Sequence, residues 1–211
     1  MLSIAMSQFF QIHPENPQAR LIRQAVEIVR SGGVIVYPTD SGYVLGCLIG
    51  DKKAVDRIRA IRRLDEKHNF TLVCRDLSEL ANFAQVNNTQ YRMIKSHTPG
   101  PYTFILKGSR EVPRRLMHPK RKTIGIRVPD CIIAQHLLAE LNEPMLSSTM
   151  QLPGDEMPMM DPYDIRDTLE SQVDLIIDGG FCGMEPTTVV SLMDDVPEVL
   201  RVGKGDPDTF Q

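Results

Sequence analysis

The apolar positions near the start of the chain follow the period of a helix and then that of a buried strand. Six apolar side chains between Pro17 and Ser31-Gly32-Gly33 recur with helical spacing: Leu21, Ile22, Ala25, Val26, Ile28 and Val29. This pattern predicts an amphipathic helix that ends at the glycine pair. The continuous apolar run Val34–Tyr37 follows and is closed by Pro38. An uninterrupted run of this length predicts a strand buried on both faces.

Helix-like and strand-like segments alternate along the rest of the chain. Further helices are expected over Lys53–Ile61, from an Asp130 cap through Leu141, and from Asp161-Pro162 onward. Further strands are expected over Phe70–Cys74, Tyr102–Lys107, Thr123–Val128, Pro144–Thr149, Asp174–Asp178, Thr187–Leu192 and Glu198–Val202. Interleaved segments of this kind predict an α/β or mixed α+β single domain, in which helices pack on an open sheet.

One of these strands combines core positions with a candidate ligand contact. The alternation in Thr123–Val128 directs the two isoleucines and the valine toward the core and the other three residues to the opposite face. Because Gly125 has no side chain, it leaves room beside Arg127 for a small ligand. A guanidinium in that place suits bidentate binding of a carboxylate or a phosphate.

Composition narrows the class of protein. A chain of 211 residues with 42% hydrophobic residues predicts one ordinary globular core rather than a repeat array. No segment approaches the roughly 20 apolar residues of a membrane span, and no leader pattern opens the chain. We therefore expect a cytoplasmic protein without a membrane partner, for which Met6 is as acceptable a start as Met1. Irregularly spaced cysteines predict reduced thiols rather than metal ligands: Cys47, Cys74, Cys131 and Cys182.

Positive charge is concentrated in one part of the chain. The net charge of −3 gives no general attraction to nucleic acid, so any such attraction needs a local patch. Candidate nucleic-acid contacts gather between residues 107 and 122, where Glu111 is the single acid: Lys107, Arg110, Arg114, Arg115, Lys120, Arg121 and Lys122. Such density can neutralise several phosphates of RNA or of a nucleoside triphosphate. The alternative is a solvated surface loop.

Three hydroxyl-rich segments adjoin expected strands: Tyr37–Tyr43, Ser147–Gly154 and Pro186–Val190. Ligands bind at strand ends in open α/β sheets, and Asp40 is a candidate to orient a ligand amine. Each segment alone also suits an ordinary turn or strand. The chain has neither a Walker loop nor a dinucleotide-binding glycine motif, and no nucleophile elbow. No residue is therefore assigned as catalytic.

Together these segments resemble the YrdC/YciO-like family in order and spacing. The resemblance rests on Tyr37–Tyr43 with Leu45-Gly46, Thr123–Pro129, Ser147–Gly154 and Pro186–Val190. It implies an N-terminal extension over residues 1–16, a YrdC-like domain over 17–205 and a C-terminal tail over 206–211. Within the family the chain most resembles the YciO branch.

The resemblance implies a YrdC/RibB-like fold, a twisted open sheet with a concave, positively charged face, and an association with double-stranded RNA. Catalytic members of the family make threonylcarbamoyl-AMP from threonine, bicarbonate and ATP, toward a modified adenosine in tRNA. Carried over by position, the amino-acid contacts would be Thr39, Arg127, Thr187 and Thr188, with Arg127 on the carboxylate. ATP with Mg²⁺ would be the other substrate, and neither a tightly bound cofactor nor a metal site of the protein is expected.

The chain departs from the family pattern where ATP is bound. Catalytic relatives carry Lys-x-Arg followed by proline after the second helix, whereas Arg62-Arg63-Leu64 stands here, and Thr149 and Gln151 replace a Ser-x-Asn pair. The predicted nucleotide contacts are Arg62, Arg63, Ser147, Thr149, Gln151 and Arg201. Losing one charge-assisted contact costs roughly 1.5–3 kcal/mol, so we expect weak or altered synthase activity. Candidates to compensate are Arg63, Arg201 and Lys204.

Three functions follow and stay open. The first is a nucleotidyltransferase of the threonylcarbamoyl-AMP synthase type, weak or altered in substrate. The second is a non-catalytic protein that binds double-stranded RNA or tRNA, and the third is an enzyme that acts on an already modified nucleoside. The expected partners are ATP or another nucleotide, threonine or a similar small amino acid, and RNA; the sequence does not predict the oligomeric state.

Overall fold

The protein is described from a computed structural model that covers residues 6–65, 67, 68 and 70–210. Residues 1–5 and 211, the outermost parts of the predicted extension and tail, lie outside the described residues. The strands are β1 (Gln8–Gln11), β2 (Ile35–Thr39), β3 (Gly42–Leu48), β4 (Thr71–Val73), β5 (Tyr102–Lys107), β6 (Thr123–Arg127), β7 (Met145–Thr149), β8 (Leu175–Asp178), β9 (Thr188–Ser191) and β10 (Glu198–Arg201). The α-helices are α1 (Ala19–Arg30), α2 (Lys52–Arg62), α3 (Leu77–Phe83), α4 (Asn88–His97), α5 (Ile132–Leu141) and α6 (Pro162–Leu169).

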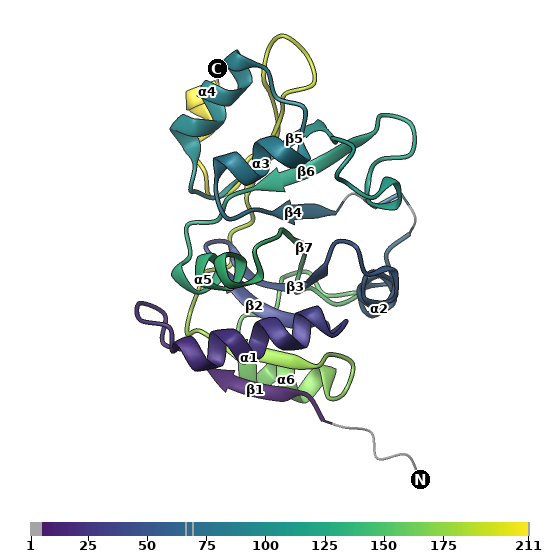
Figure 1. Ribbon diagram of the computed structural model, residues 1–211, viewed down its shortest axis with the longest axis vertical. Helices are drawn as coiled ribbons and strands as arrows, with labels where there is room; N and C mark the ends of the chain where they lie inside the picture. Colours follow the sequence, from purple (N-terminus) through teal and green to yellow (C-terminus); the bar gives the residue numbers. More distant parts are fainter. Residues whose placement is uncertain (1–5, 66, 69, 211) are drawn as a thin grey trace.

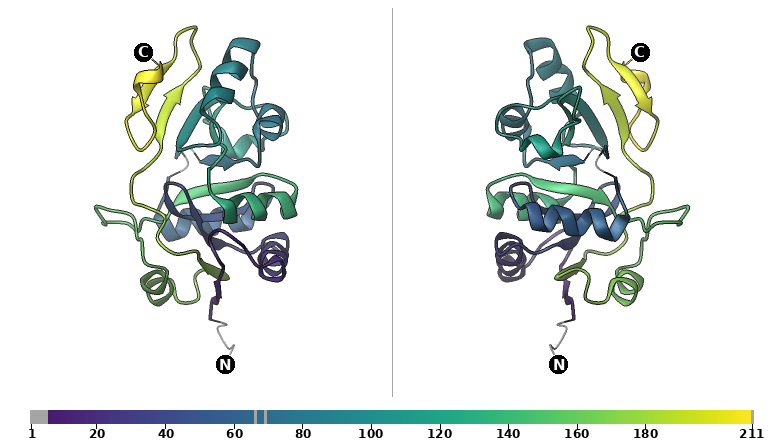
Figure 2. Two further views of the ribbon diagram at one scale, coloured as in Figure 1. Left: turned by 90° about the vertical axis from the view of Figure 1, so that its left-hand side faces the viewer. Right: turned by 90° about the vertical axis from the view of Figure 1, so that its right-hand side faces the viewer.

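All the strands belong to one mixed sheet with the order β1-β8-β2-β3-β7-β4-β6-β5-β9-β10. Figure 1 shows α1 and α6 near the β1 edge and α3 and α4 near the other end of the molecule. Figure 2 shows β9 and β10, in yellow-green and yellow, on the opposite side of the molecule from α1. The expected single mixed α/β domain, with helices packed on an open sheet, is confirmed.

The two faces of the sheet carry separate buried clusters. Along β2, Val36 belongs to the cluster packed by α2, α3, α4 and α6, whereas Ile35 and Tyr37 belong to the cluster packed by α1 and α5. The α1 and α5 cluster takes in residues of β3, β4 and β7, and none of its described members comes from β5, β6 or β9. Part of that face therefore has no helix over it among the described elements.

The alternation expected for β6 is confirmed. Ile124 and Ile126 lie in the larger cluster with Val128, the residue after the strand. Gly125 and Arg127 point to the opposite face, where α1 and α5 do not reach. This face is nonetheless enclosed, because every residue of β6 is buried. The Arg127 position is therefore a buried site rather than an exposed one.

Several elements differ from the sequence prediction. β1, β3, α3 and α4 were not expected, and Pro38 lies inside β2 instead of closing it. The N-cap of α5 is Cys131 rather than Asp130. Asp130 lies one residue before the cap, and its backbone N–H donates to the Asp40 carboxylate at 2.9 Å. The β3 segment has glycines at both Gly42 and Gly46, which is why it reads as a loop in the sequence.

Segments outside the predicted 17–205 domain join its sheet and core. β1 pairs in parallel with β8, and Phe210 is buried with its ring 4.3 Å from that of His97. The boundaries at residues 17 and 205 stay a prediction. All four cysteines are free, two of them buried and two partly exposed. None of the described helices has both the length and the apolar character needed to cross a bilayer.

Gly46 is required by the close packing of β3 on β2. A Cβ at this position would overlap the Tyr37 ring and lie 3.1 Å from the Leu146 carbonyl oxygen. Because Tyr37 is fully buried, we expect Gly46→Ala to lower the free energy of unfolding by roughly 1–3 kcal/mol. Urea denaturation measures this, with Gly50→Ala as the control, since a Cβ on Gly50 meets nothing within 4 Å. Equal losses in the two variants would contradict the packing described.

Candidate functional site

A cavity of about 350 Å³ occupies the part of the sheet face that α1 and α5 leave uncovered. Its floor follows one row across four neighbouring strands, since Ser147, Thr71, Gly125 and Ile105 stand opposite one another in β7, β4, β6 and β5. A Cβ added to Gly125 would lie 3.0 Å from the Thr71 hydroxyl and 3.1 Å from Thr103 Cγ2. The absence of a side chain at Gly125 therefore keeps the floor open, as its sequence position predicted.

Basic side chains outnumber acidic ones in the lining of the cavity. Its described lining residues include four arginines and two histidines and no carboxylate: Arg62, Arg121, Arg127, Arg201, His68 and His118. Pockets for small molecules begin at roughly 300 Å³, so the volume suits a compact ligand or part of a larger one. Asp40, just outside the lining, is ion-paired with Arg127. The other three arginines still leave an excess of positive charge, which in a concave site favours a negatively charged ligand.

The cations stand at two ends of the cavity. β6 enters at Thr123 and leaves at Arg127, four residues later, which separates these two positions by roughly 13 Å. β7 is antiparallel to β4, and β4 is parallel to β6. The last residue of β7, Thr149, therefore lies at the same edge of the sheet as the start of β6. We call this edge the Arg62 end and the opposite one the Arg127 end.

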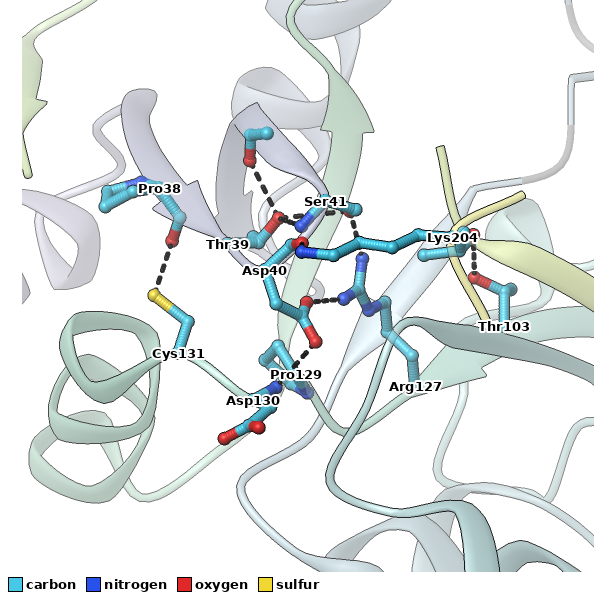
Figure 3. Close-up of polar contacts among 12 residues, drawn as sticks. Pro38, Thr39, Asp40, Ser41, Thr103, Arg127, Pro129, Asp130, Cys131 and Lys204 are labelled. Atoms are coloured by element: carbon cyan, nitrogen blue, oxygen red, sulfur yellow. Dashed lines mark hydrogen bonds and ion pairs between the residues drawn. The ribbon is translucent and has the colours of Figure 1, made fainter. Parts of the chain in front are cut away.

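At the Arg127 end, a network of buried polar contacts holds the guanidinium in place (Figure 3). Arg127 Nη2 is ion-paired with the Asp40 carboxylate, and Nη1 donates to the Ser41 hydroxyl at 2.7 Å. Lys204 Nζ donates to the Asp40 carbonyl oxygen at 2.6 Å. The Arg127 side chain is 4% exposed, and its Nε–H is buried without a hydrogen-bond partner among the described residues. One N–H of a fixed guanidinium is thus unused by the described residues.

Two threonines continue this end of the cavity. The hydroxyls of Thr103 and Thr187 are 2.8 Å apart, and both residues are buried. Arg201 Nη2 donates to the Thr187 hydroxyl at 3.1 Å and to its carbonyl oxygen at 2.9 Å. Because Thr187 Oγ1 accepts from Arg201, its own proton is available to Thr103 or to a ligand.

The Arg62 end is built where α2 stops. α2 is capped by the Asp51 side chain, and Arg63 closes it in the left-handed conformation with φ 51°. Arg62, the last helical residue, donates from Nη1 to the Ser148 hydroxyl at 2.8 Å and from Nε to the Gln151 carbonyl oxygen at 3.0 Å. Partial burial lowers the pKa of the Arg62 guanidinium. An anion bound beside it would offset that loss of hydration.

His68 lies beside Arg62 at this end. Burial is the main cause that lowers the pKa of His68, and the neighbouring Arg62 and Arg59 lower it further. Its ring meets that of Phe70 edge-on, with 5.4 Å between centroids. The imidazole is therefore held neutral near pH 7, and it adds a hydrogen-bonding group without adding charge.

The cavity brings together many of the residues predicted as contacts, but not all of them. Those that line it are Arg62, Ser147, Thr149, Arg121, Arg127, Thr187 and Arg201. Thr39 and Thr188 point elsewhere, because their hydroxyls donate to the carbonyl oxygens of Gly42 and Gly205 at 2.7 and 2.5 Å. Arg63 is exposed and does not line the cavity, and the Gln151 amide donates to the Asp155 carbonyl oxygen at 2.8 Å.

Other lining residues were not identified from the sequence. Thr71, Thr103, His68 and His118 lie on no recognisable motif, although the alternation of β5 places Thr103 on the face opposite Phe104. All seven residues of the predicted nucleic-acid patch are exposed, and Arg121 alone of them lines the cavity. Asp40, a candidate to orient a ligand amine, does not line this cavity, because Arg127 and the Asp130 N–H occupy its carboxylate.

Sequence comparison relates these features to known proteins. The sequence model of the Sua5/YciO/YrdC family, described as "Telomere recombination", matches residues 27–203. The chain belongs to the Sua5/YciO/YrdC family. It is 65% identical to an uncharacterized protein of Haemophilus influenzae and 63% identical to the uncharacterized protein YciO of Escherichia coli, over 97% of this chain and all of each relative. The resemblance predicted from the motifs is thereby confirmed.

Members of the Sua5/YciO/YrdC family share the fold described above. The crystal structure of E. coli YciO matches with a TM-score of 0.94, covering 98% of this chain and all of that one. P. abyssi Sua5, solved in complex with L-threonine, matches with a TM-score of 0.85 at 25% identity, over 93% of this chain and 58% of that one. The threonylcarbamoyl-AMP synthase of Vibrio vulnificus is 26% identical over 75% of this chain and 86% of its own length. The family therefore includes threonylcarbamoyl-AMP synthases.

Proposed function

We propose that this protein binds ATP and threonine, or a similar small amino acid, and joins them in a slow reaction of the threonylcarbamoyl-AMP synthase type. The observation that carries the proposal is the cavity with two cationic ends roughly 13 Å apart along β6 and no carboxylate among its described lining residues. A ligand pair with a carboxylate at one end and phosphates at the other matches that distribution of charge. The relationship to the V. vulnificus synthase supports this choice of substrates.

In this proposal each end of the cavity has its own task. At the Arg127 end, the free Nε–H and the Thr187 hydroxyl bind the amino-acid carboxylate. At the Arg62 end, Arg62 and the hydroxyls of Ser148 and Thr149 bind phosphoryl oxygens. Bicarbonate supplies CO₂, to which the amino group of the amino acid adds with loss of a proton, so that a carbamate forms and water is released overall. An oxygen of this carbamate then attacks the α-phosphorus, and the bond to the β,γ-pyrophosphate breaks. The protein contributes alignment of two anions and offsets their charge, which together are large terms in such reactions.

The lining residues do not provide a magnesium site. Mg²⁺ prefers carboxylate and other oxygen ligands, and no carboxylate is present in the described lining. In the part of the chain that the structure describes, no group of three His, Cys, Asp or Glu side chains is arranged to hold a metal ion. Magnesium would therefore enter as a complex with the triphosphate, and the steps above use only the side chains of this chain.

A single-turnover assay tests the proposal. ATP labelled at its α-phosphate is mixed with excess protein, bicarbonate and Mg²⁺, with and without threonine. We expect labelled threonylcarbamoyl-adenylate and pyrophosphate to form only when threonine is present. Nucleotide binding without any threonine-dependent product would reject the synthase assignment.

A second candidate function, RNA binding, is favoured by the exposure of the whole predicted patch between Lys107 and Lys122. RNA affinity falls as salt concentration rises, and each phosphate contact makes the slope of log affinity against log salt steeper by roughly 0.7–0.9. We expect the triple variant Arg110→Gln, Arg114→Gln, Lys120→Gln to bind an RNA hairpin with a slope shallower by about two. None of the three lines the cavity, so synthase turnover is the control and stays unchanged. An unchanged slope would show that this loop does not contact RNA.

A further inference from the structure

His118 is held in one tautomer at the edge of the cavity. Its Nδ1 accepts the backbone N–H groups of Lys120 at 3.3 Å and Arg121 at 3.1 Å. A ring nitrogen that accepts two N–H groups carries no proton, so the proton of the neutral imidazole lies on Nε2. His118 also lines the cavity, and its remaining polar atom is a hydrogen-bond donor.

The turn that carries His118 is tightly fixed to the start of β6. The His118 N–H donates to the Thr123 carbonyl oxygen at 2.8 Å, and the Lys122 N–H donates to the His118 carbonyl oxygen at 2.9 Å. Lys122 adopts φ 57° to close the turn. This geometry directs Arg121 to the cavity, where no other described side chain is hydrogen-bonded or ion-paired with its guanidinium. A ring N–H donor and a guanidinium without a described side-chain partner thus lie on the same turn.

The pair faces Arg62 across the same end of the cavity. β6, which follows the turn, is two strands from β7, where Ser148 and Thr149 accompany Arg62. Two strand spacings amount to roughly 10 Å. The phosphoryl chain of a nucleotide fits between groups placed at that separation, with Arg62 on one side and Arg121 on the other.

The sequence analysis named three cations that could compensate for the altered ATP contacts, and none of them is available at the Arg62 end. Arg63 is exposed and does not line the cavity. Arg201 is engaged with Thr187 at the opposite end, and Lys204 donates to the Asp40 carbonyl oxygen. His118 and Arg121 come from a segment far from α2 in sequence, and they reach the Arg62 end through the fold.

We propose that His118 Nε2 and the Arg121 guanidinium form a second phosphoryl-binding subsite, which takes the outer phosphates of a nucleoside triphosphate. The assignment of the nucleotide to this end rests on the proposed function. The chemical class of the ligand, a pyrophosphoryl group, rests on the charge and the donors of the subsite. In this proposal Arg121 binds a ligand in the cavity rather than nucleic acid at the exposed patch.

Calorimetric titration with inorganic pyrophosphate tests the subsite directly. His118→Asn keeps an acceptor near the place of Nδ1, and so preserves the turn, but removes the Nε2–H. We expect His118→Asn and Arg121→Gln each to weaken pyrophosphate binding by roughly tenfold or more. The matched control is Lys120→Gln, which removes the same charge from the same turn at a residue that does not line the cavity. In the control we expect less than about a twofold change at physiological salt.

Three results would overturn the subsite. They are an absence of pyrophosphate binding to the unsubstituted protein, equal losses in Arg121→Gln and Lys120→Gln, or full affinity in His118→Asn. Thermal unfolding of each variant checks that the turn is intact, and Arg121→Gln, at an exposed position, tests the subsite even where His118→Asn unfolds. The titration requires no turnover. If the two variants bind pyrophosphate more weakly but the unsubstituted protein forms no threonine-dependent adenylate, the proposed reaction is rejected and the subsite is retained.

Discussion

Replacement of Arg127 by methionine is expected to abolish threonine-dependent adenylate formation and to lower the free energy of unfolding by roughly 3–5 kcal/mol. The loss of activity follows from removal of the guanidinium that offers its Nε–H to the amino-acid carboxylate. The loss of stability follows because Asp40, 8% exposed, would keep a buried charge without its partner. Urea denaturation measures the second effect, and the single-turnover assay measures the first.

A double variant separates these two effects. Asp40→Asn combined with Arg127→Met removes both charges, so the buried charge left by the single change disappears. We expect the double variant to regain part of the lost stability and none of the activity. If the double variant recovered threonine-dependent turnover along with stability, Arg127 would act only by holding the fold. A stable, fully active Arg127→Met protein would place the amino acid elsewhere.

The position of Arg127 could be predicted from the sequence, but its partner could not. The strict alternation of β6 sets which face each side chain meets, because neighbouring residues in a strand point in opposite directions. The Asp40 contact joins residues 87 positions apart, and it depends on how the β2–β3 turn meets the end of β6. No local pattern encodes such a contact, so the sequence predicted the room that Gly125 leaves beside Arg127 but not the ion pair with Asp40.

The threonines also show that a local sequence pattern does not predict the hydrogen-bond partner of a side chain. Thr39, Thr187 and Thr188 look alike in sequence, as small polar residues at strand ends. Thr187 lines the cavity, whereas Thr39 and Thr188 satisfy carbonyl oxygens of the chain itself. A threonine beside an unpaired carbonyl bonds to it by preference, and which carbonyl is unpaired is decided by the tertiary structure.

The missed helices, in contrast, did carry local signals. Asn87 and Gln90 form a capping box at the start of α4, and Asp76 caps α3 by accepting from the Glu79 N–H at 2.8 Å. A polar residue followed three positions later by Glu or Gln is a recognisable helix start. These helices bury few residues, Leu80 and Ile94 among them, so their apolar periodicity is weak and the cap is the stronger signal.

Binding of phosphates at the Arg62 end predicts different effects for two adjacent arginines. Arg62→Met is expected to lower kcat/KM for ATP by roughly ten- to hundredfold, because Arg62 lines the cavity and holds Ser148 beside it. Arg63→Met is the matched control, since Arg63 is the next residue, is exposed and does not line the cavity. We expect the control to retain its kcat/KM within about twofold.

The same pair of variants tests how Arg62 acts. Its bonds to Ser148 and Gln151 are half-buried, so we expect Arg62→Met to lower the free energy of unfolding by only about 1–2 kcal/mol. A protein that remains folded yet loses ATP turnover would show that the guanidinium acts on the nucleotide, because a structural loss of that size leaves the native state dominant. Equal losses of kcat/KM in Arg62→Met and Arg63→Met would instead mean that the phosphates bind outside the cavity. The assignment of nucleotide to the Arg62 end would then be wrong, since only Arg62 of the two faces that space.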